Sequence, residues 1–408
     1  MSVELESVIP HLDELSAEEW GVIRTLLRNP DLTRSAIAER IGFGLSKTDS
    51  LLKGLHARGY LRIREAEVSA KGRRPFMYSV VPDLVYFVGA ELHVVYDRIV
   101  IMDFAGDVIH AAEYPPSYAA EDVVGSVLRN VTTTIEDSKV ERSRISALGI
   151  SLHGIIDYTE GLIHRVLYSG EEIELDVKTP LSQELSIPVF VAQSRILILY
   201  REKGPAVFDL KGVTVNLYHG YGLGVGLFID GNFFRSSTGM AGQIGHVPVP
   251  GNDKPCYCGN VGCLRTLVSY KGICERAAEE LAKGYVSNID PEKLKGPKYE
   301  DGVNHIIDCA LKQDKVSVAL IHETSELLGN ALAQVVNLFN PDRLFVHTNL
   351  VRAGELFTAP LRLYTQRNSL SSSFACLEFE FTTLAPFAVA EGGAFFALCE
   401  FAGSKGEE

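Results

Sequence analysis

The sequence has no apolar run long enough to span a bilayer, and its first residues lack the basic start and apolar core of a signal peptide. We therefore expect a cytoplasmic protein without membrane contact. The seven cysteines are then expected to be reduced thiols, which favours a metal site over a disulfide. With 46% apolar and 22% charged residues, the 408-residue chain has a globular composition, and its length predicts two or three domains.

Positive charge is scarce over most of the chain. The formal net charge is −13, which argues against nucleic acid as a partner if the chain is taken as a whole. The distribution of charge points the other way. Residues 20–80 carry twelve Lys and Arg against five Asp and Glu, whereas the first nineteen residues carry six acids and no base. A compact basic module on an acidic body is the asymmetry expected of a protein that binds a polyanion.

Residues 16–80 predict three short helices followed by a β-hairpin. Helix N-caps are expected at Ser16, Thr33 and Ser46, the first and last as capping boxes with an acid three residues on. This pattern is typical of a winged helix-turn-helix, whose third helix enters the major groove of DNA. The expected DNA contacts lie on the exposed face of the third helix and at the hairpin tip: Ser46, Lys47, Ser50, Lys53, Lys71, Arg73 and Arg74. A docking adaptor without DNA affinity is the alternative.

The remainder of the chain repeats one plan. Residues 84–114 and 212–239 are each predicted to form three strands joined by tight turns, and each copy is followed by helical and strand segments. Such duplication predicts two similar α/β lobes that face one another across a cleft. We expect a DNA-binding domain at 1–81, a first lobe at 82–205 and a second lobe at 206–385, with a C-terminal helix at about 386–402 that packs back on the first lobe.

A candidate metal site lies in GQIGHVPVPGNDKPCYCGNVGCLR, residues 242–265. One imidazole and three thiols fall within eighteen residues: His246, Cys256, Cys258 and Cys263. A Cys₃His set closes a tetrahedral sphere, which suits structural rather than catalytic zinc. Two glycines beside Cys258 and Cys263 permit the sharp backbone path that brings these thiols to one ion. We expect zinc to tie a long loop to the body; three buried thiols near a core histidine are the alternative.

These segments resemble the ROK family, which groups repressors, uncharacterised reading frames and sugar kinases. GMAGQIGHVPV and CYCGNVGCLRTLVS are similar to its A-G-E-x-G-H and C-x-C-G-x-x-G-C-L-E segments, GYGLGVGLFIDG to its G-T-G-x-G-x-G loop, ALGISLHGIID to its G-x-x-x-P-G-x-x-D segment, and GRRP to its wing. The resemblance implies an α/β body with an actin-like, ribonuclease-H-like fold. For members with an N-terminal winged helix it implies a sugar-responsive transcription factor of the xylose-repressor or N-acetylglucosamine-repressor type.

The sequence lacks the catalytic acid that the resemblance to sugar kinases would require. The Asn-Asp pair of the family corresponds to Gln193 and Ser194, and neither side chain can act as a base near neutral pH. The first phosphate loop of the family corresponds to a stretch that carries Glu91 and His93, and the last loop has also lost its glycine pair. We therefore expect no phosphoryl transfer. A kinase with another base, such as Glu91 or Asp157, is the alternative.

The sugar contacts implied by the family are altered as well. Acids are replaced at four positions: Gln193, Ser194, Gln243 and Arg265. This exchange turns an acceptor-rich pocket into a donor-rich one, which suits a sugar acid or sugar phosphate held by the guanidinium of Arg265. A vestigial cleft on a body that serves dimerisation and protein docking is the second interpretation, and a neutral sugar the third.

The predicted function is DNA-binding transcriptional regulation by a protein with a catalytically inactive, kinase-like body. The third helix of a single winged helix covers only part of an operator. We therefore expect a homodimer or dimer of dimers on near-palindromic operator DNA. A sugar-derived effector that changes the angle between the lobes would alter the spacing of the paired modules. It can do so only if it binds the two states with different affinity.

Overall fold

The N-terminal module has three helices and a small sheet. The helices are α1 (Ala17–Arg28), α2 (Arg34–Ile41) and α3 (Leu45–Ala57), and the strands are β1 (Leu32–Thr33), β2 (Leu61–Glu65) and β3 (Phe76–Val80). Strand β3 pairs antiparallel with both β1 and β2. This computed structural model describes residue 12 and residues 15–65, 75–119, 122–152, 154–157, 160–166, 175–236 and 239–404. The module is a winged helix, which confirms the predicted fold of this segment.

Two of the three predicted helix starts are confirmed. The capping box at Ser16 is present, and the hydroxyl of Thr33 accepts a hydrogen bond at the start of α2. The predicted capping box at Ser46 is wrong, because Gly44 is the extended N-cap residue of α3 and makes no side-chain bond. The chain enters this helix two residues earlier than predicted. Ser46 therefore lies within the first turn, and the carboxylate of Asp49 forms ion pairs instead.

The body contains two five-stranded sheets of the same design. The first comprises β4 (Tyr86–Leu92), β5 (Asp97–Asp103), β6 (Val108–Tyr114), β7 (Ile145–Ser151) and β11 (Val189–Ala192); the second comprises β12 (Val213–His219), β13 (Leu223–Ile229), β14 (Asn232–Phe233), β15 (Arg343–His347) and β16 (Glu378–Thr382). Their orders are β11-β7-β4-β5-β6 and β14-β13-β12-β15-β16. In both, the first three strands are antiparallel neighbours and the fourth is parallel to the first. The predicted duplication is confirmed.

Helices and a third sheet complete the two lobes. The first lobe carries α4 (Val123–Ser138), α5 (Lys178–Leu185) and a sheet of β8 (Gly154–Asp157), β9 (Leu162–Val166) and β10 (Leu175–Asp176). The second carries α7 (Arg265–Val268), α8 (Tyr270–Ala282), α9 (Tyr299–Leu311), α10 (Lys315–Phe339), α11 (Glu355–Arg367) and α12 (Ser371–Ala375). In the described part of the chain, no helix combines the length and apolar character that crossing a bilayer requires.

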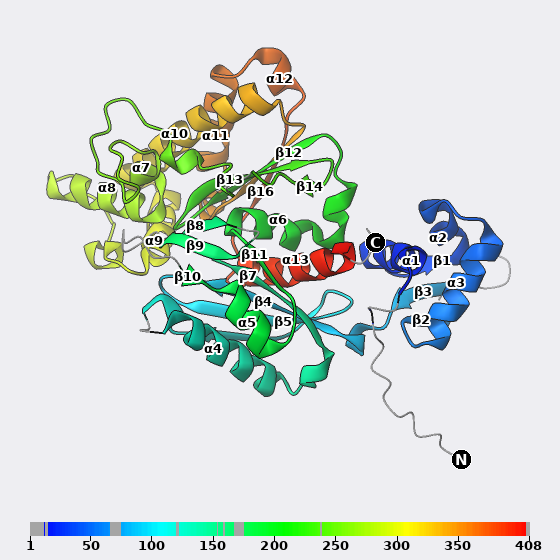
Figure 1. Ribbon diagram of the computed structural model, residues 1–408. Helices are drawn as coiled ribbons and strands as arrows, with labels where there is room; N and C mark the ends of the chain where they lie inside the picture. The colour runs from blue at the N-terminus through cyan, green and yellow to red at the C-terminus, as the bar shows by residue number, and fades with distance from the viewer. Residues whose placement is uncertain are drawn as a thin grey trace.

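Two helices lie at the centre of the molecule, α6 (Ser194–Lys203) and α13 (Ala388–Ser404), and they pack against each other. Helix α13 also packs on β4 and β7, and its far end lies beside α1 of the winged helix (Figure 1). Helix α13 packs on β4 and β7 backbone to backbone. A Cβ at Gly89 of β4 would lie 1.9 Å from the carbonyl oxygen of Ala390, and a Cβ at Gly149 of β7 would lie 1.9 Å from that of Gly393. Only glycine permits this approach.

Candidate functional site

Four metal-ligating side chains come together beside β13. They belong to His246, in the short helix η6 (Ile244–His246), and to Cys256, Cys258 and Cys263, and their ligand atoms all lie within 4.8 Å of one another. The Sγ of Cys256 is 3.7 Å from Nδ1 of His246, and the Sγ atoms of Cys258 and Cys263 are 3.7 Å apart. A tetrahedral zinc ion with Zn–S bonds of about 2.3 Å separates its ligands by about 3.8 Å. The cluster therefore fits one tetrahedral metal ion.

The imidazole of His246 is oriented for this role. Its Nε2 lies 3.0 Å from the hydroxyl of Tyr257, which leaves Nδ1 facing the thiols. Burial, together with the positive charge of Arg265, lowers the pKa of His246 to about 4. The ring is therefore neutral at pH 7, the form that binds metals, and a hydrogen bond on the second nitrogen fixes which nitrogen is available.

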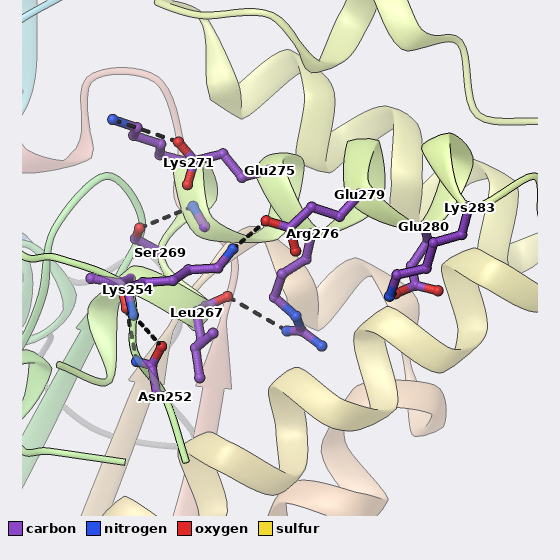
Figure 2. Close-up of polar contacts among 12 residues, drawn as sticks. Asn252, Lys254, Leu267, Ser269, Lys271, Glu275, Arg276, Glu279, Glu280 and Lys283 are labelled. Carbon is purple, nitrogen blue, oxygen red and sulfur yellow. Dashed lines mark hydrogen bonds and ion pairs between the residues drawn. The ribbon is translucent and has the colours of Figure 1, made fainter. Parts of the chain in front are cut away.

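The loop that carries the thiols is also fixed by contacts outside the cluster. Lys254 pairs with Glu279 of α8 at 2.6 Å, and the amide of Asn252 accepts from the backbone N–H of Lys254 (Figure 2). Gly262 has a φ of +84°, and a Cβ there would lie 2.6 Å from the carbonyl oxygen of Asn252. This turn requires glycine, and it delivers Cys263 to the cluster.

The four residues predicted to contact an effector line one cavity between the lobes: Gln193, Ser194, Gln243 and Arg265. The cavity measures about 520 Å³ when its open mouth is included. The other described lining residues are Leu152, Gly154, Arg195, Tyr218, Gly222, Leu223, Gly224 and Tyr257. None of these described residues carries a carboxylate. The pocket is therefore rich in hydrogen-bond donors and contains positive charge.

On the first-lobe side, Gln193 and Ser194 occupy the start of α6. The amide nitrogen of Gln193 donates to the carbonyl of Gly154 at 3.0 Å. Its Oε1 is buried without a hydrogen-bond partner among the described residues, and the residue is only 7% exposed. The hydroxyl of Ser194 lies 3.1 Å from that of Ser151. Because an unpaired buried amide oxygen is costly, Gln193 has a hydrogen-bonding site available for a ligand or water.

On the second-lobe side, Arg265 lies at the start of α7. Its guanidinium stacks 4.1 Å from the ring centre of Tyr257, and one nitrogen donates to the carbonyl of Tyr221 at 3.4 Å. It forms no ion pair with any acid in the described parts of the chain. Its charge can be offered to an anion.

A further pocket residue, Arg195, was missed by the sequence analysis. It lies on α6 directly after Ser194, is 6% exposed, and donates to the carbonyl of Ala241 at 2.8 Å. A single arginine opening the apolar run RILILY could have signalled it, because a charge on a buried helix needs a specific environment. The pocket thus has one guanidinium from each lobe.

The two acids considered as alternative catalytic bases lie outside this pocket. Glu91 is 2% exposed and lines a separate cavity, and burial raises its pKa to about 8 even though Arg98 acts in the opposite direction. Asp157, at the end of β8, accepts a hydrogen bond from the backbone N–H of Glu160. Neither residue is among those lining the cavity of Gln193.

The segment that corresponds to the first phosphate loop is filled by aromatic rings. His93 is completely buried, stacks on Tyr96 with ring centres 4.4 Å apart, and meets the ring of Tyr221 edge-on at 4.3 Å. Tyr96 belongs to the first lobe and Tyr221 follows β12 in the second. Side chains thus occupy a region where nucleotide phosphates would need accessible backbone N–H groups.

The predicted groove-facing residues of α3 are all exposed: Ser46, Lys47, Ser50 and Lys53. The opposite face of α3 packs inward through Thr48 and Leu52, both fully buried. Lys47 forms an ion pair with Glu18 of α1, and Lys53 pairs with Asp49 at 2.7 Å. The predicted wing contacts at Lys71, Arg73 and Arg74 lie outside the described residues.

The two lobes, the Cys₃His cluster at the cleft and the N-terminal winged helix define a protein with a sugar-kinase-like body and an attached DNA-binding fold. Residues 91–392 match the ROK family, and the chain belongs to that family. It is 28% identical over 381 residues to the xylose repressor of Caldicellulosiruptor bescii, covering 91% of this chain and 92% of that protein. It is 24% identical over 338 residues to the N-acetylglucosamine repressor of Escherichia coli O157:H7, covering 82% and 81%.

Solved structures and family enzymes give two further comparisons. The crystal structure of a ROK family transcriptional regulator, a homolog of the E. coli MLC protein, matches with a TM-score of 0.76 and 19% identity, covering 96% of this chain and 98% of that one. A glucokinase of Halalkalibacterium halodurans is 25% identical over 319 residues, covering 76% of this chain and 93% of the enzyme. The family therefore includes both repressors and kinases.

Proposed function

We propose that the chain is a DNA-binding transcriptional regulator whose interlobe pocket binds a small anionic ligand, such as a sugar acid or sugar phosphate, and which does not phosphorylate sugars. We further propose that it works in the cytoplasm as a homodimer on operator DNA, with a DNA-binding unit at 1–81 and lobes at 82–205 and 206–385. The repressors that match over four fifths or more of the chain support the regulatory part.

One observation carries the assignment of the ligand class. The pocket that holds Gln193 and Ser194 contains two guanidinium groups, from Arg195 and Arg265, and no carboxylate among its described lining residues. Guanidinium groups bind carboxylates and phosphates through paired hydrogen bonds. Gln193, Ser194 and Gln243 can hydrogen-bond the hydroxyls of a sugar. The guanidinium of Arg265, which pairs with no acid in the described parts of the chain, favours an anion over a neutral sugar.

The same pocket argues against a kinase. Removing a proton from a sugar hydroxyl requires a base within hydrogen-bonding reach of it. Ser194 stands where the family has its Asp, and Glu91 and Asp157 do not line the pocket. The aromatic cluster around His93 further opposes the binding of a triphosphate. ATP turnover with a panel of hexoses tests this point: sugar phosphorylation above that of a protein-free control would contradict it.

We assign zinc to the cluster of His246 and the three thiols. A closed set of one nitrogen and three sulfur donors is typical of structural zinc, and the 3.7 Å separations suit its bond lengths. Such an ion would fix Tyr257, which lies between two ligands, and Arg265, two residues beyond the last. Both line the pocket, so the metal would shape the binding site without contacting the ligand.

Thermal stability of the metal-loaded protein tests the ligand class. A ligand at about 100 times its Kd stabilises the native state by about 2.7 kcal/mol, which raises Tm by several degrees. We expect glucose 6-phosphate or gluconate, but not glucose, to produce such a shift. Because a hydrogen bond to a charged group contributes about 1.5 to 3 kcal/mol, Arg265→Met should weaken binding by a factor of about ten to a hundred.

Lys271→Met is the matched control for that measurement. Lys271 is an exposed cation on α8, paired with Glu275 at 3.6 Å, and it does not line the pocket. The Lys271→Met variant should keep the full ligand-induced shift. Equal stabilisation of native protein and Arg265→Met by glucose would show that the site takes a neutral sugar. No shift with any of the three compounds would favour a vestigial cleft.

A further inference from the structure

Helix α6 connects the interlobe pocket to the winged helix. Its first two residues, Ser194 and Arg195, line the pocket, and its last residue, Lys203, is followed directly by the short helix η5 (Gly204–Asp209). The ten residues of α6 span about 15 Å. Every residue from Ser194 to Tyr200 is buried, so this helix runs through the core (Figure 1).

The packing around α6 leaves its backbone little freedom. A Cβ at Gly392 of α13 would lie 2.0 Å from the carbonyl oxygen of Leu197, and a Cβ at Gly226 of β13 would lie 2.7 Å from that of Arg195. The buried amide of Asn216 donates to the same Arg195 carbonyl at 2.7 Å. Helix α6 is therefore held, backbone against backbone, between helix α13, which packs on the first lobe, and strand β13 of the second lobe. A relative movement of the lobes must displace it as a unit.

At its other end, η5 contacts α1 of the winged helix. Asp209 pairs with Arg28 of α1 at 3.2 Å, and the guanidinium of Arg28 lies 5.5 Å from the ring centre of Phe208. The β13–β14 turn presses on η5 from the other side, since a Cβ at Gly231 would lie 2.6 Å from the carbonyl oxygen of Val207. A displacement of η5 is thus passed to α1.

The contact between α1 and the body continues into one shared core. Trp20 of α1 is completely buried and meets Phe401 of α13 edge-on, with ring centres 6.4 Å apart. Trp20, Val207 and the buried apolar residues of α6, from Ile196 to Tyr200, belong to the same apolar cluster. The winged helix is therefore packed on the end of the α6–α13 pair and is not simply tethered to it.

We propose that α6 and η5 form the mechanical connection through which pocket occupancy controls the orientation of the winged helix. The inference rests on the proposed function, since it names how that pocket regulates DNA binding. A ligand held by Gln193 and Ser194 at the start of α6 and by Arg265 of the second lobe draws the two lobes together around α6. The helix shifts along its axis, and η5 carries the shift to α1 through Phe208 and Asp209. The predicted result is a change in operator affinity without any ligand contact to the DNA-binding module.

The test uses a pocket perturbation that needs no ligand. Ser194→Leu adds volume at the first turn of α6 and forces the pocket to adjust. The readouts are affinity for a DNA fragment selected by the native full-length protein from random sequence, and the emission of Trp20. Because Trp20 is the only tryptophan, its emission reports on the contact between α1 and the body. We expect Ser194→Leu to change DNA affinity about fivefold or more and to shift that emission.

The connection is then interrupted by Asp209→Arg, which places two positive charges together at Arg28. The control is Asp83→Arg. It replaces the ion pair of Arg62 and Asp83, 2.9 Å apart and outside η5, with two positive charges. The effect of Ser194→Leu on both readouts should disappear in the Asp209→Arg background and persist in the Asp83→Arg background. An equal effect in both backgrounds, or no effect of Ser194→Leu in a folded protein, would overturn the proposal.

These outcomes are separable from failure of the proposed function. If glucose 6-phosphate and gluconate do not stabilise the native protein but Ser194→Leu acts through Asp209, the ligand class is wrong and the connection stands. If the native protein selects no DNA, the regulatory function is wrong, and Trp20 emission still reports whether the pocket and α1 are coupled. If gluconate binds and shifts neither DNA affinity nor Trp20 emission, the connection is wrong and the ligand class stands.

Discussion

Removal of the zinc ion that we propose for the cluster of His246, Cys256, Cys258 and Cys263 is expected to lower the Tm of the protein by about 10 °C and to abolish ligand binding in the interlobe pocket. A structural zinc ion contributes directly to folding, because the folded chain binds it far more tightly than the unfolded chain does. Loss of a few kcal/mol of unfolding free energy corresponds to a fall of this size. The three thiols lie within 4.8 Å of one another, and without the ion they lose the metal–sulfur bonds that compensate their burial.

The loss of ligand binding follows from where the loop lies. Tyr257 is flanked by two of the thiols, and its ring supports the guanidinium of Arg265 at 4.1 Å. Without the ion, the thiol-bearing turns lose their link to His246, and what remains is the hydrogen bonding within the loop, such as Asn252 to Cys263 and Thr266, and the Lys254–Glu279 ion pair. A partly exposed ion pair of this kind contributes at most about 1 kcal/mol. Both pocket residues would then sample many positions, and the paired hydrogen bonds to an anion would be lost.

The experiment compares Cys263→Ser, chelator-treated native protein and Cys376→Ser. Cys376 is exposed and does not belong to the cluster, so its replacement should leave Tm, metal content and gluconate binding unchanged. Zinc added to chelated native protein should restore both properties, whereas Cys263→Ser should not recover. A metal-free native protein with unchanged Tm would show that the cluster is only a group of buried thiols.

Features encoded by closely spaced residues could be predicted from the sequence. The spacing of Cys256, Cys258 and Cys263 fixes the geometry of the cluster almost by itself, since a stretch of eight residues with two glycine turns leaves the chain few paths. The duplicated strand-and-turn pattern predicted two similar α/β lobes, because strand periodicity and turn chemistry are local. The order of the strands in the two sheets, which is the same, was not predicted. The capping box at Ser16 and the cap at Thr33 are local in the same sense.

Features that depend on tertiary packing could not be predicted from the sequence. Ser46 and Asp49 fit a capping box, yet Gly44 begins the helix, because the preceding turn delivers the chain there and Asp49 has partners on two helices. The apolar run RILILY indicates that Arg195 opens a buried helix, but the groups that surround it come from β13 and the loop at Ala241, which are about 30 and 46 residues away in sequence. The position of α6 between the lobes is likewise set by glycines on β13 and α13.

Replacing Lys47 and Lys53 of α3 together with alanine is expected to weaken DNA binding about 30-fold at 0.15 M salt and to reduce the salt dependence. Each phosphate contact releases counterions and contributes a slope of about −0.9 to the plot of log K against log salt, so two contacts per bound copy contribute about −1.8. Both side chains are exposed on the face of α3 opposite the buried Leu52. Their acidic partners, Glu18 and Asp49, stay behind in the variant and add repulsion.

Those ion pairs also supply the controls that separate a DNA contact from a general loss of charge. Lys271→Ala with Lys295→Ala removes two exposed, acid-paired lysines from the body and should change neither affinity nor slope. Glu18→Gln frees Lys47 from its partner and should raise affinity, because DNA no longer competes for the ammonium group. An unchanged slope for the α3 variant would remove that helix from the interface. A reduced slope in both double variants would mean that the DNA responds only to net charge, and that the basic module binds without a defined docking face.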